Sequence, residues 1–316
     1  MVRLNPLNRR PDREQAYGAD MSRQQREAIR QLRESSPLDL GGAVHEQRVL
    51  FEQVLSHHAV PEDVIVTEAR YDTVSGLLVE LADQPSAGTV LYFHGGAYVL
   101  GSARSSLGIV ADLARRSHTR VITIDYRLAP EHPAPAATDD AVRAYRALIA
   151  SGVDARRVVV AGESAGGGIA LGLLAALSSA GDPMPAAALL FSPWVDLTLS
   201  GDSMTTRAEA DFIVNRTALE RRVRDYVGDG SRAEQHSPLF ADLRDLPATL
   251  IQVGSHEVLL DDSTRLAARL VAADVSVTLD VTAEATHVFQ SFAASWDEAD
   301  AAMTRAGTFV RTALAP

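Results

Sequence analysis

A serine flanked by glycines is the first feature of the sequence that could do chemistry. Gly162-Glu163-Ser164-Ala165-Gly166 matches G-x-S-x-G, follows the apolar run Val158–Ala161 and opens a stretch of small residues typical of a helix. A serine on a sharp strand-to-helix turn is lifted above a sheet, and glycine is needed where strand and helix come close. The pattern therefore predicts that Ser164 is the nucleophile of an acyl-transfer reaction.

A second glycine pair lies where it could stabilise the charge formed in that reaction. His94-Gly95-Gly96-Ala97 follows the apolar run Thr89–Phe93, as an H-G-G-G-type segment should. We expect the N–H groups of both glycines and of Ala165 to form an oxyanion hole, where removal of one donor costs about 10²–10³ in turnover. The alanine in the fourth position leaves this set intact. The histidine is expected to brace the loop by hydrogen bonds and not to transfer protons.

A serine hydroxyl becomes a good nucleophile when a base takes its proton. His287 is the best candidate for this base, since it comes late in the chain after the expected strand Val275–Val281 and a short loop. The base must in turn be held by a carboxylate. Glu257 follows the expected strand Thr249–Val253, and the order serine, acid, histidine is the one known from α/β hydrolases.

Three carboxylates compete for the role of the acid. Glu257 is four residues past Val253, in the loop where the site of an open α/β sheet is built. Asp261 and Asp262 come after an apolar triplet and directly before a helical stretch. They fit better as helix-start residues, which accept backbone N–H bonds and favour the helix dipole.

Alternating strands and helices must position these residues. Short, nearly continuous apolar runs suit strands buried on both faces of a parallel sheet. Helical stretches separate them, which predicts an open, mostly parallel sheet with helices on both sides. Two earlier strands are expected around a turn at Ser75-Gly76. The expected strands are Val64–Ala69, Leu77–Leu81, Thr89–Phe93, Val121–Ile124, Val158–Ala161, Ala187–Phe191 and Thr249–Val253, and the expected helices are Ser105–Arg116, Ala136–Ser151, Ala165–Ser179, Ser263–Ala273 and Ala294–Leu314.

Two regions depart from this alternation, although no linker divides the chain, and we expect one domain over residues 1–316. The first 50 or so residues are polar and charged, and they form either a loose extension or a helical lid. Leu199–Asp229 is charged and has no strand pattern, so it could fold over the site as an insertion. A helical cap from about 1–50 and about 199–229 is therefore expected.

Several further polar and aromatic residues invite a functional interpretation. In the loop Asp125–Pro133, we favour a structural role over a chemical one. Arg127, Glu131 and Asp139 or Asp140 are expected to form a buried ion-pair network that shapes the loop. Tyr98 and Trp194 are candidates for substrate binding. The apolar positions of the N-terminal segment are also expected to line the acyl or alcohol pocket. A plain core role for Trp194 is equally open.

Composition excludes several classes of protein. The chain has 316 residues, a hydrophobic fraction of 46% and a formal net charge of −11, so it can bury a large core and has an acidic surface. We therefore expect neither nucleic acid nor an anionic membrane as partner. It contains no cysteine, which excludes thiolate catalysis and Cys-based zinc sites. The N-terminus lacks an apolar signal region, and a cytoplasmic location is the expectation.

As a set, the motifs resemble the bacterial hormone-sensitive-lipase-like esterases, over roughly residue 64 to the end. The resemblance rests on HGGAYVLGS from His94, DYRLAPEHPAPAATDD from Asp125, GESAGGG from Gly162, and the stretches GSHEVLLDDS and THVF. Where many relatives carry Asp in an Asp-Pro-Leu context, this chain has Glu257. The family's Leu and second Asp correspond to Leu259 and Asp261.

This resemblance implies an α/β-hydrolase fold and hydrolysis of short- to medium-chain carboxylic esters by a Ser–acid–His triad, without metal or cofactor. It also implies a lid and, through the last edge strand Val275–Val281, a homodimer. Lactone or arylamide hydrolysis by the same mechanism stays open. A non-catalytic small-molecule receptor is the competing class, but such receptors lack a working histidine base.

Overall fold

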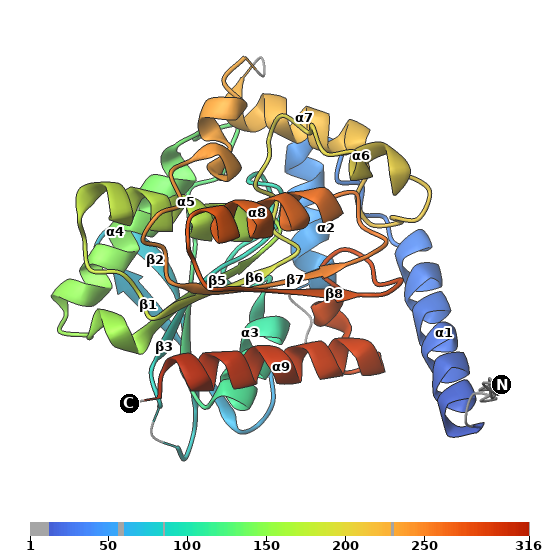
Figure 1. Cartoon of the computed structure of the whole chain (residues 1–316), viewed down its shortest axis with the longest axis horizontal. Helices are drawn as coiled ribbons and strands as arrows, with labels where there is room; N and C mark the ends of the chain where they lie inside the picture. Colours follow the sequence, from blue (N-terminus) through green and yellow to red (C-terminus); the bar gives the residue numbers. More distant parts are fainter. Residues whose placement is uncertain (1–12, 56–59, 85, 229–230, 316) are drawn as a thin grey trace, which may run out of the picture.

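An eight-stranded sheet forms the centre of the computed structural model, which describes residues 13–55, 60–84, 86–228 and 231–315 (Figure 1). The strand order is β1-β2-β4-β3-β5-β6-β7-β8. β1 and β2 are antiparallel to each other, β2 is antiparallel to β4, and the other neighbours are parallel. The strands are β1 (Val64–Tyr71), β2 (Val74–Leu81), β3 (Thr89–Phe93), β4 (Arg120–Ile124), β5 (Val158–Glu163), β6 (Ala187–Phe191), β7 (Ala248–Gly254) and β8 (Val277–Thr282).

Helices cover both faces of this sheet. In Figure 1, α3 and α9 lie below it and α5 and α8 lie above it, while α4, at the left, packs against α5. Every residue of β3, β5 and β6 is buried, which explains why these strands are continuous apolar runs. The expected α/β-hydrolase architecture is thereby confirmed. The helices are α1 (Arg13–Glu34), α2 (Val44–Leu55), α3 (Leu107–Ser117), α4 (Ala136–Ala150), α5 (Ala165–Ala180), α6 (Ser203–Thr206), α7 (Arg216–Val227), α8 (Leu260–Ala272) and α9 (Asp297–Ala313).

The expected turn at Ser75-Gly76 is wrong. The chain reverses earlier, at residues 72–73, where Asp72 has a φ of 56°. Gly76 instead lies inside β2, and a Cβ there would be 2.2 Å from the carbonyl oxygen of Thr123 on β4. This glycine therefore permits close approach of two strands and makes no turn.

Hydrogen bonds connect the N-terminal segment to the insertion after β6. Arg221 and Arg222 of α7 donate hydrogen bonds of 2.6 Å to the carbonyl oxygens of Gly41 and Gly42, just before α2. The Arg222 side chain is fully buried. Residues 1–12 of the expected cap lie outside the described residues. Across the helices that the structure does describe, no segment combines the length and apolar character needed to cross a membrane.

Candidate active site

Ser164 lies on a tight turn between β5 and α5, at the carboxyl edge of the sheet. Its backbone has a φ of 53° and a ψ of −120°, a conformation that side-chain-bearing residues rarely adopt. A Cβ on Gly162 would lie 2.4 Å from the carbonyl oxygen of Gly166, and one on Gly166 would lie 2.0 Å from that of Phe93. Glycine is therefore required on both sides of Ser164, and the strand and helix can close around it.

A chain of hydrogen bonds joins Ser164, His287 and Glu257. His287 Nε2 lies 2.9 Å from Ser164 Oγ, and His287 Nδ1 lies 2.9 Å from Glu257 Oε2. The three residues come from three separate loops at the same sheet edge, after β5, β7 and β8. Neither Asp261 nor Asp262 contacts the histidine. The arrangement can move a proton from the serine hydroxyl to the imidazole while the carboxylate holds the ring.

Other contacts hold Glu257 in place. Its Oε1 accepts hydrogen bonds from the Ser192 hydroxyl at 2.7 Å and from the Gly254 N–H at 2.5 Å. The side chain is fully buried, and this burial raises the pKa of Glu257 against the lowering effect of its donors. Ser192 also accepts the N–H of Val288, next to the histidine, at 3.1 Å. Ser192 thus joins the acid loop to the histidine loop.

The environment of His287 favours its protonated form. Burial lowers the pKa of His287, but the hydrogen bond and charge of Glu257 and the charge of Asp211 raise it above the ordinary histidine value. Asp211 belongs to the insertion and is buried, and its carboxylate accepts the N–H of Val258, one residue past the acid. The insertion therefore contributes directly to the charge and geometry around the histidine.

The glycine-rich segment after β3 corrects one expectation. The N–H of Gly95 donates to Glu163 Oε1 at 2.8 Å, so the prediction that Gly95 serves the oxyanion is wrong. Within the described part of the chain, the N–H groups of Gly96, Ala97 and Ala165 have no hydrogen-bond partner. A φ of 107° at Gly96 and 53° at Ala97 turns this backbone sharply. Of the three expected donors, Gly96 and Ala165 are therefore free, and Ala97 takes the place of Gly95.

His94 supports this segment. It is 1% exposed and stacks on Tyr126 with ring centroids 4.1 Å apart. Its Nδ1 lies 2.7 Å from the carbonyl oxygen of Gly95, and burial lowers the pKa of His94 to about 4. The imidazole is thus neutral near pH 7 and braces the loop.

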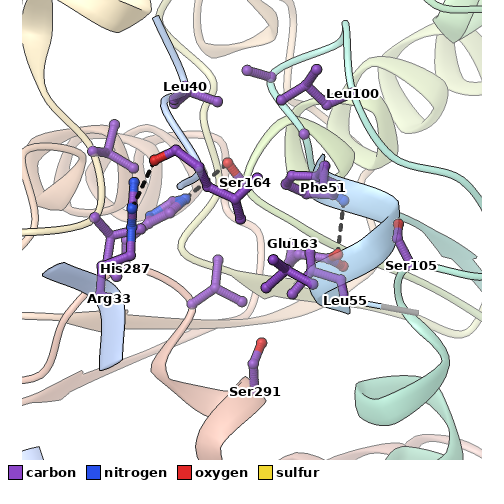
Figure 2. A pocket seen from close by; sticks show the side chains of 18 of the residues that line it. Arg33, Leu40, Phe51, Leu55, Leu100, Ser105, Glu163, Ser164, His287 and Ser291 are labelled. Atoms are coloured by element: carbon purple, nitrogen blue, oxygen red, sulfur yellow. Dashed lines mark hydrogen bonds between the residues drawn. The ribbon is translucent and has the colours of Figure 1, made fainter. Parts of the chain in front are cut away.

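A cavity of about 270 Å³ opens beside Ser164 (Figure 2). Its lining is largely apolar, and much of it comes from the N-terminal helices and the insertion. A contribution from apolar positions of the N-terminal segment was expected, although no single position was named there. The spacing of Phe51 and Leu55 places both on one face of α2, and both line the cavity. The apolar lining includes Ile29, Leu32, Leu38, Leu40, Phe51, Val54, Leu55, Leu100, Ile109, Ile213, Val214, Leu219, Val288 and Phe292.

Tyr98 and Trp194 do not line this cavity. Trp194 is fully buried in the core. Tyr98 stacks on Tyr226 with ring centroids 4.0 Å apart, and it borders a different cavity. The expectation that these two residues contact substrate in the Ser164 pocket is therefore wrong, and the core role of Trp194 holds.

The neighbouring carboxylates bind elsewhere. Asp261 and Asp262 occupy the first turn of α8, as expected, but they do not cap it. Asp261 accepts the N–H of Ser203, and Asp262 accepts those of Val195 and Asp196, each at 2.8 Å. Burial raises the pKa of Asp262 to about 8. Both side chains join α8 to the segment after β6.

The polar loop after β4 forms two ion pairs in place of one network. Arg127 binds both carboxylate oxygens of Asp140, at 2.8–3.1 Å. Glu131 pairs with Arg48 of α2, which also donates to the carbonyl oxygens of Val99 and Ala129. The expected inclusion of Glu131 with Arg127 is therefore wrong. No group of three or more His, Cys, Asp or Glu side chains suited to a metal ion occurs in the described ranges.

Comparison with known proteins places this geometry in a family. A family model described as alpha/beta hydrolase fold matches residues 90–291. An acetyl-hydrolase of Streptomyces hygroscopicus is 38% identical over 291 residues, covering 91% of this chain and 96% of the relative. An esterase of Acinetobacter venetianus is 37% identical over 233 residues, covering 73% of this chain and 77% of the relative.

Solved structures agree with the sequence matches. The crystal structure of an esterase from the bacterial hormone-sensitive lipase family superposes with a TM-score of 0.87 at 36% identity, over 94% of this chain and 99% of that one. The crystal structure of EstE5 soaked with p-nitrophenyl butyrate also gives a TM-score of 0.87, at 34% identity, over 92% of this chain and 99% of that one. The chain therefore belongs to the α/β-hydrolase fold family and, within it, to the esterases related to bacterial hormone-sensitive lipase.

Proposed function

We propose that Ser164 is the nucleophile, His287 the general base and Glu257 the acid of a carboxylesterase triad. The observation that carries this proposal is the continuous chain of two 2.9 Å contacts from Ser164 Oγ through the imidazole to Glu257. Family membership makes the protein a serine ester hydrolase, and these hydrogen bonds support the assignment of the three residues.

The reaction follows from the placement of these groups. The Ser164 oxygen attacks the ester carbonyl carbon as its proton passes to His287 Nε2. The C–O bond to the alcohol then breaks, and the alcohol leaves with the proton held by His287, so that the acyl group stays on Ser164. Water next attacks the carbonyl carbon of this acyl-enzyme and gives a proton to His287. The bond from the acyl carbon to Ser164 Oγ then breaks, His287 returns the proton to Oγ, and the acid leaves. Glu257 orients the ring and stabilises the imidazolium.

The oxyanion of each tetrahedral intermediate needs preorganised donors. We assign this role to the N–H groups of Gly96, Ala97 and Ala165, because they have no other partner in the described chain. Glu163 supports them indirectly, since it holds the N–H of Gly95 and accepts the Ser106 hydroxyl at 2.8 Å.

The pocket supports short- to medium-chain esters as substrates. A volume of about 270 Å³ with an apolar lining suits a small ester, since burial of each CH₂ contributes about 0.8 kcal/mol. We further propose that the expected segments of about 1–50 and 199–229 form a cap over Ser164, because their described residues supply much of this lining. We also propose a homodimer that forms through β8, which lies at one edge of the sheet, opposite the edge formed by β1.

Replacing the nucleophile tests the central assignment. Ser164→Ala should fold normally and lose on the order of 10⁴–10⁶ in turnover of p-nitrophenyl acetate and butyrate. A fluorophosphonate probe should label the wild type and leave this variant unlabelled. Ser179→Ala, at the exposed end of the same helix, is the matched control and should stay active and labelled. Substantial turnover by folded Ser164→Ala would remove the proposal.

A further inference from the structure

One cation faces the pocket beside Ser164. Of the described residues that line it, the ionisable ones are Arg33, Glu163 and His287. Glu163 is engaged by Gly95 and Ser106, and His287 belongs to the chain of contacts with Ser164. Arg33, near the end of α1, is the member whose charge is not used by the chemistry proposed above.

Arg33 keeps most of its donors available. Its Nη1 donates to the carbonyl oxygen of Leu38 at 2.8 Å, whereas a guanidinium carries five N–H donors. Burial lowers the pKa of Arg33, against the opposite effect of Asp39 and Asp211, but the group stays charged near neutral pH. Among the described residues, no carboxylate lies within ion-pair distance of it. A partly buried cation in an apolar wall is stabilised when an anion binds it.

The position of Arg33 selects one part of the substrate. His287 must give its proton to the leaving alkoxide, so the alcohol part of an ester lies on the histidine side of Ser164. In Figure 2, Arg33 and His287 lie on the same side of the pocket, opposite Ser105. Asp211 acts electrostatically on both the guanidinium and the imidazole, which agrees with this view.

We propose that Arg33 binds a carboxylate on the alcohol part of the ester, so that the preferred substrates are O-acyl derivatives of short hydroxy acids. The inference rests on the proposed function of Ser164 and adds the substrate class. The carboxylate would accept two N–H bonds from the guanidinium, while the connecting methylene groups would contact the apolar lining around Leu38 and Leu40.

An isosteric pair of substrates tests this proposal. The anionic 4-acetoxybutanoate and the neutral 4-acetoxybutanamide differ at one terminal atom, and acetate release measures both. The wild type should prefer the anion by about 10- to 100-fold in kcat/KM, the range for a hydrogen bond to a charged group. Arg33→Met should bring the ratio close to one, whereas Arg33→Lys should keep part of it. Arg30→Met is the matched control, because Arg30 lies over the Phe212 ring and outside this pocket, and it should keep the full ratio.

The melting temperatures of all variants show whether α1 still packs against the domain. Because the ratio of the two kcat/KM values is measured on one protein preparation, it does not depend on how much of each variant is active. A wild-type ratio near one, with the amide hydrolysed, would overturn this inference and leave the esterase proposal standing. Hydrolysis of neither compound, nor of p-nitrophenyl butyrate, would instead contradict the proposed function. A second pair carries the charge on the acyl side, monoethyl glutarate against ethyl glutaramate. An Arg33-dependent preference in that pair, and none in the acetoxy pair, would also overturn the proposal.

Discussion

At the scale of single residues, Glu257 shows how one carboxylate does two tasks. One oxygen holds His287 at 2.9 Å, and the other is fixed by Ser192 and the Gly254 N–H. Because both oxygens are occupied and the side chain is fully buried, its geometry does not depend on solvent. A glutamine at this position would fit the space. Its NH₂ group would, however, face either His287 or the pair formed by Ser192 and the Gly254 N–H, which now face a carboxylate oxygen.

The acid assignment therefore has a direct test. Glu257→Gln should keep the fold and lose about 10²–10⁴ in kcat, because the imidazole loses its orienting charge. Asp261→Asn is the matched control, since Asp261 accepts the N–H of Ser203 and does not reach His287. Steady-state kinetics with p-nitrophenyl butyrate and a melting curve decide the matter. Loss of activity in folded Asp261→Asn, with Glu257→Gln still active, would show the acid to be misplaced.

The pH profile is a second consequence at this scale. His287 must be neutral to accept the proton of Ser164, and its pKa is raised above the ordinary 6.5 by Glu257 and Asp211 in spite of burial. The neutral fraction therefore falls as the pH drops through a value above 6.5, and kcat/KM should fall with it. In Glu257→Gln, the midpoint of the residual activity should move to lower pH. If the acidic side of the wild-type profile has its midpoint below pH 6.5, the inferred environment of His287 is contradicted.

Residue types were enough to find some of these groups and not others. Ser164, Glu257 and His287 were selected by motif and by chain order, and the structure brings all three together. Among the proposed oxyanion donors, Gly96 and Ala165 were named from the sequence, whereas Gly95 was named in place of Ala97. A motif gives no information on where each N–H points, and that of Gly95 turns toward Glu163. Arg33 had no signal in the sequence, since its place in the pocket depends on how α1 packs.

At the scale of elements, the apolar runs predicted the buried strands well. Thr89–Phe93 and Ala187–Phe191 have the bounds expected from their hydrophobicity. The turn before them was placed wrongly, because Ser75-Gly76 has the composition of a turn while Gly76 is needed for contact with β4. Asp262 was expected to bind its own helix, yet it binds the backbone after β6. Both errors come from contacts between segments distant in sequence, which local patterns do not contain.

At the scale of the whole molecule, β8 ends the sheet: among the described residues it pairs with β7 alone, and its other edge has no partner strand. The carbonyl oxygens of Ser276 and Thr282 accept hydrogen bonds from the N–H groups of Thr249, in β7, and of Ser255, directly after β7. Since backbone direction alternates along a strand, the N–H and C=O groups of Val277, Leu279 and Val281 point outward. Such an edge can add a strand from another chain.

The proposed homodimer predicts that two copies of β8 pair at this edge. Size-exclusion chromatography with light scattering should give twice the chain mass of 33.8 kDa at micromolar concentration. Val281 is 44% exposed on β8, and Val281→Lys should shift the protein toward the monomer, because lysine on an edge strand opposes pairing. Val271→Lys is the matched control: this valine is 62% exposed on α8, so the same substitution there should leave the dimer intact. A wild-type monomer across this range would rule the interface out, and a dimer unaffected by Val281→Lys would place the contact on another surface.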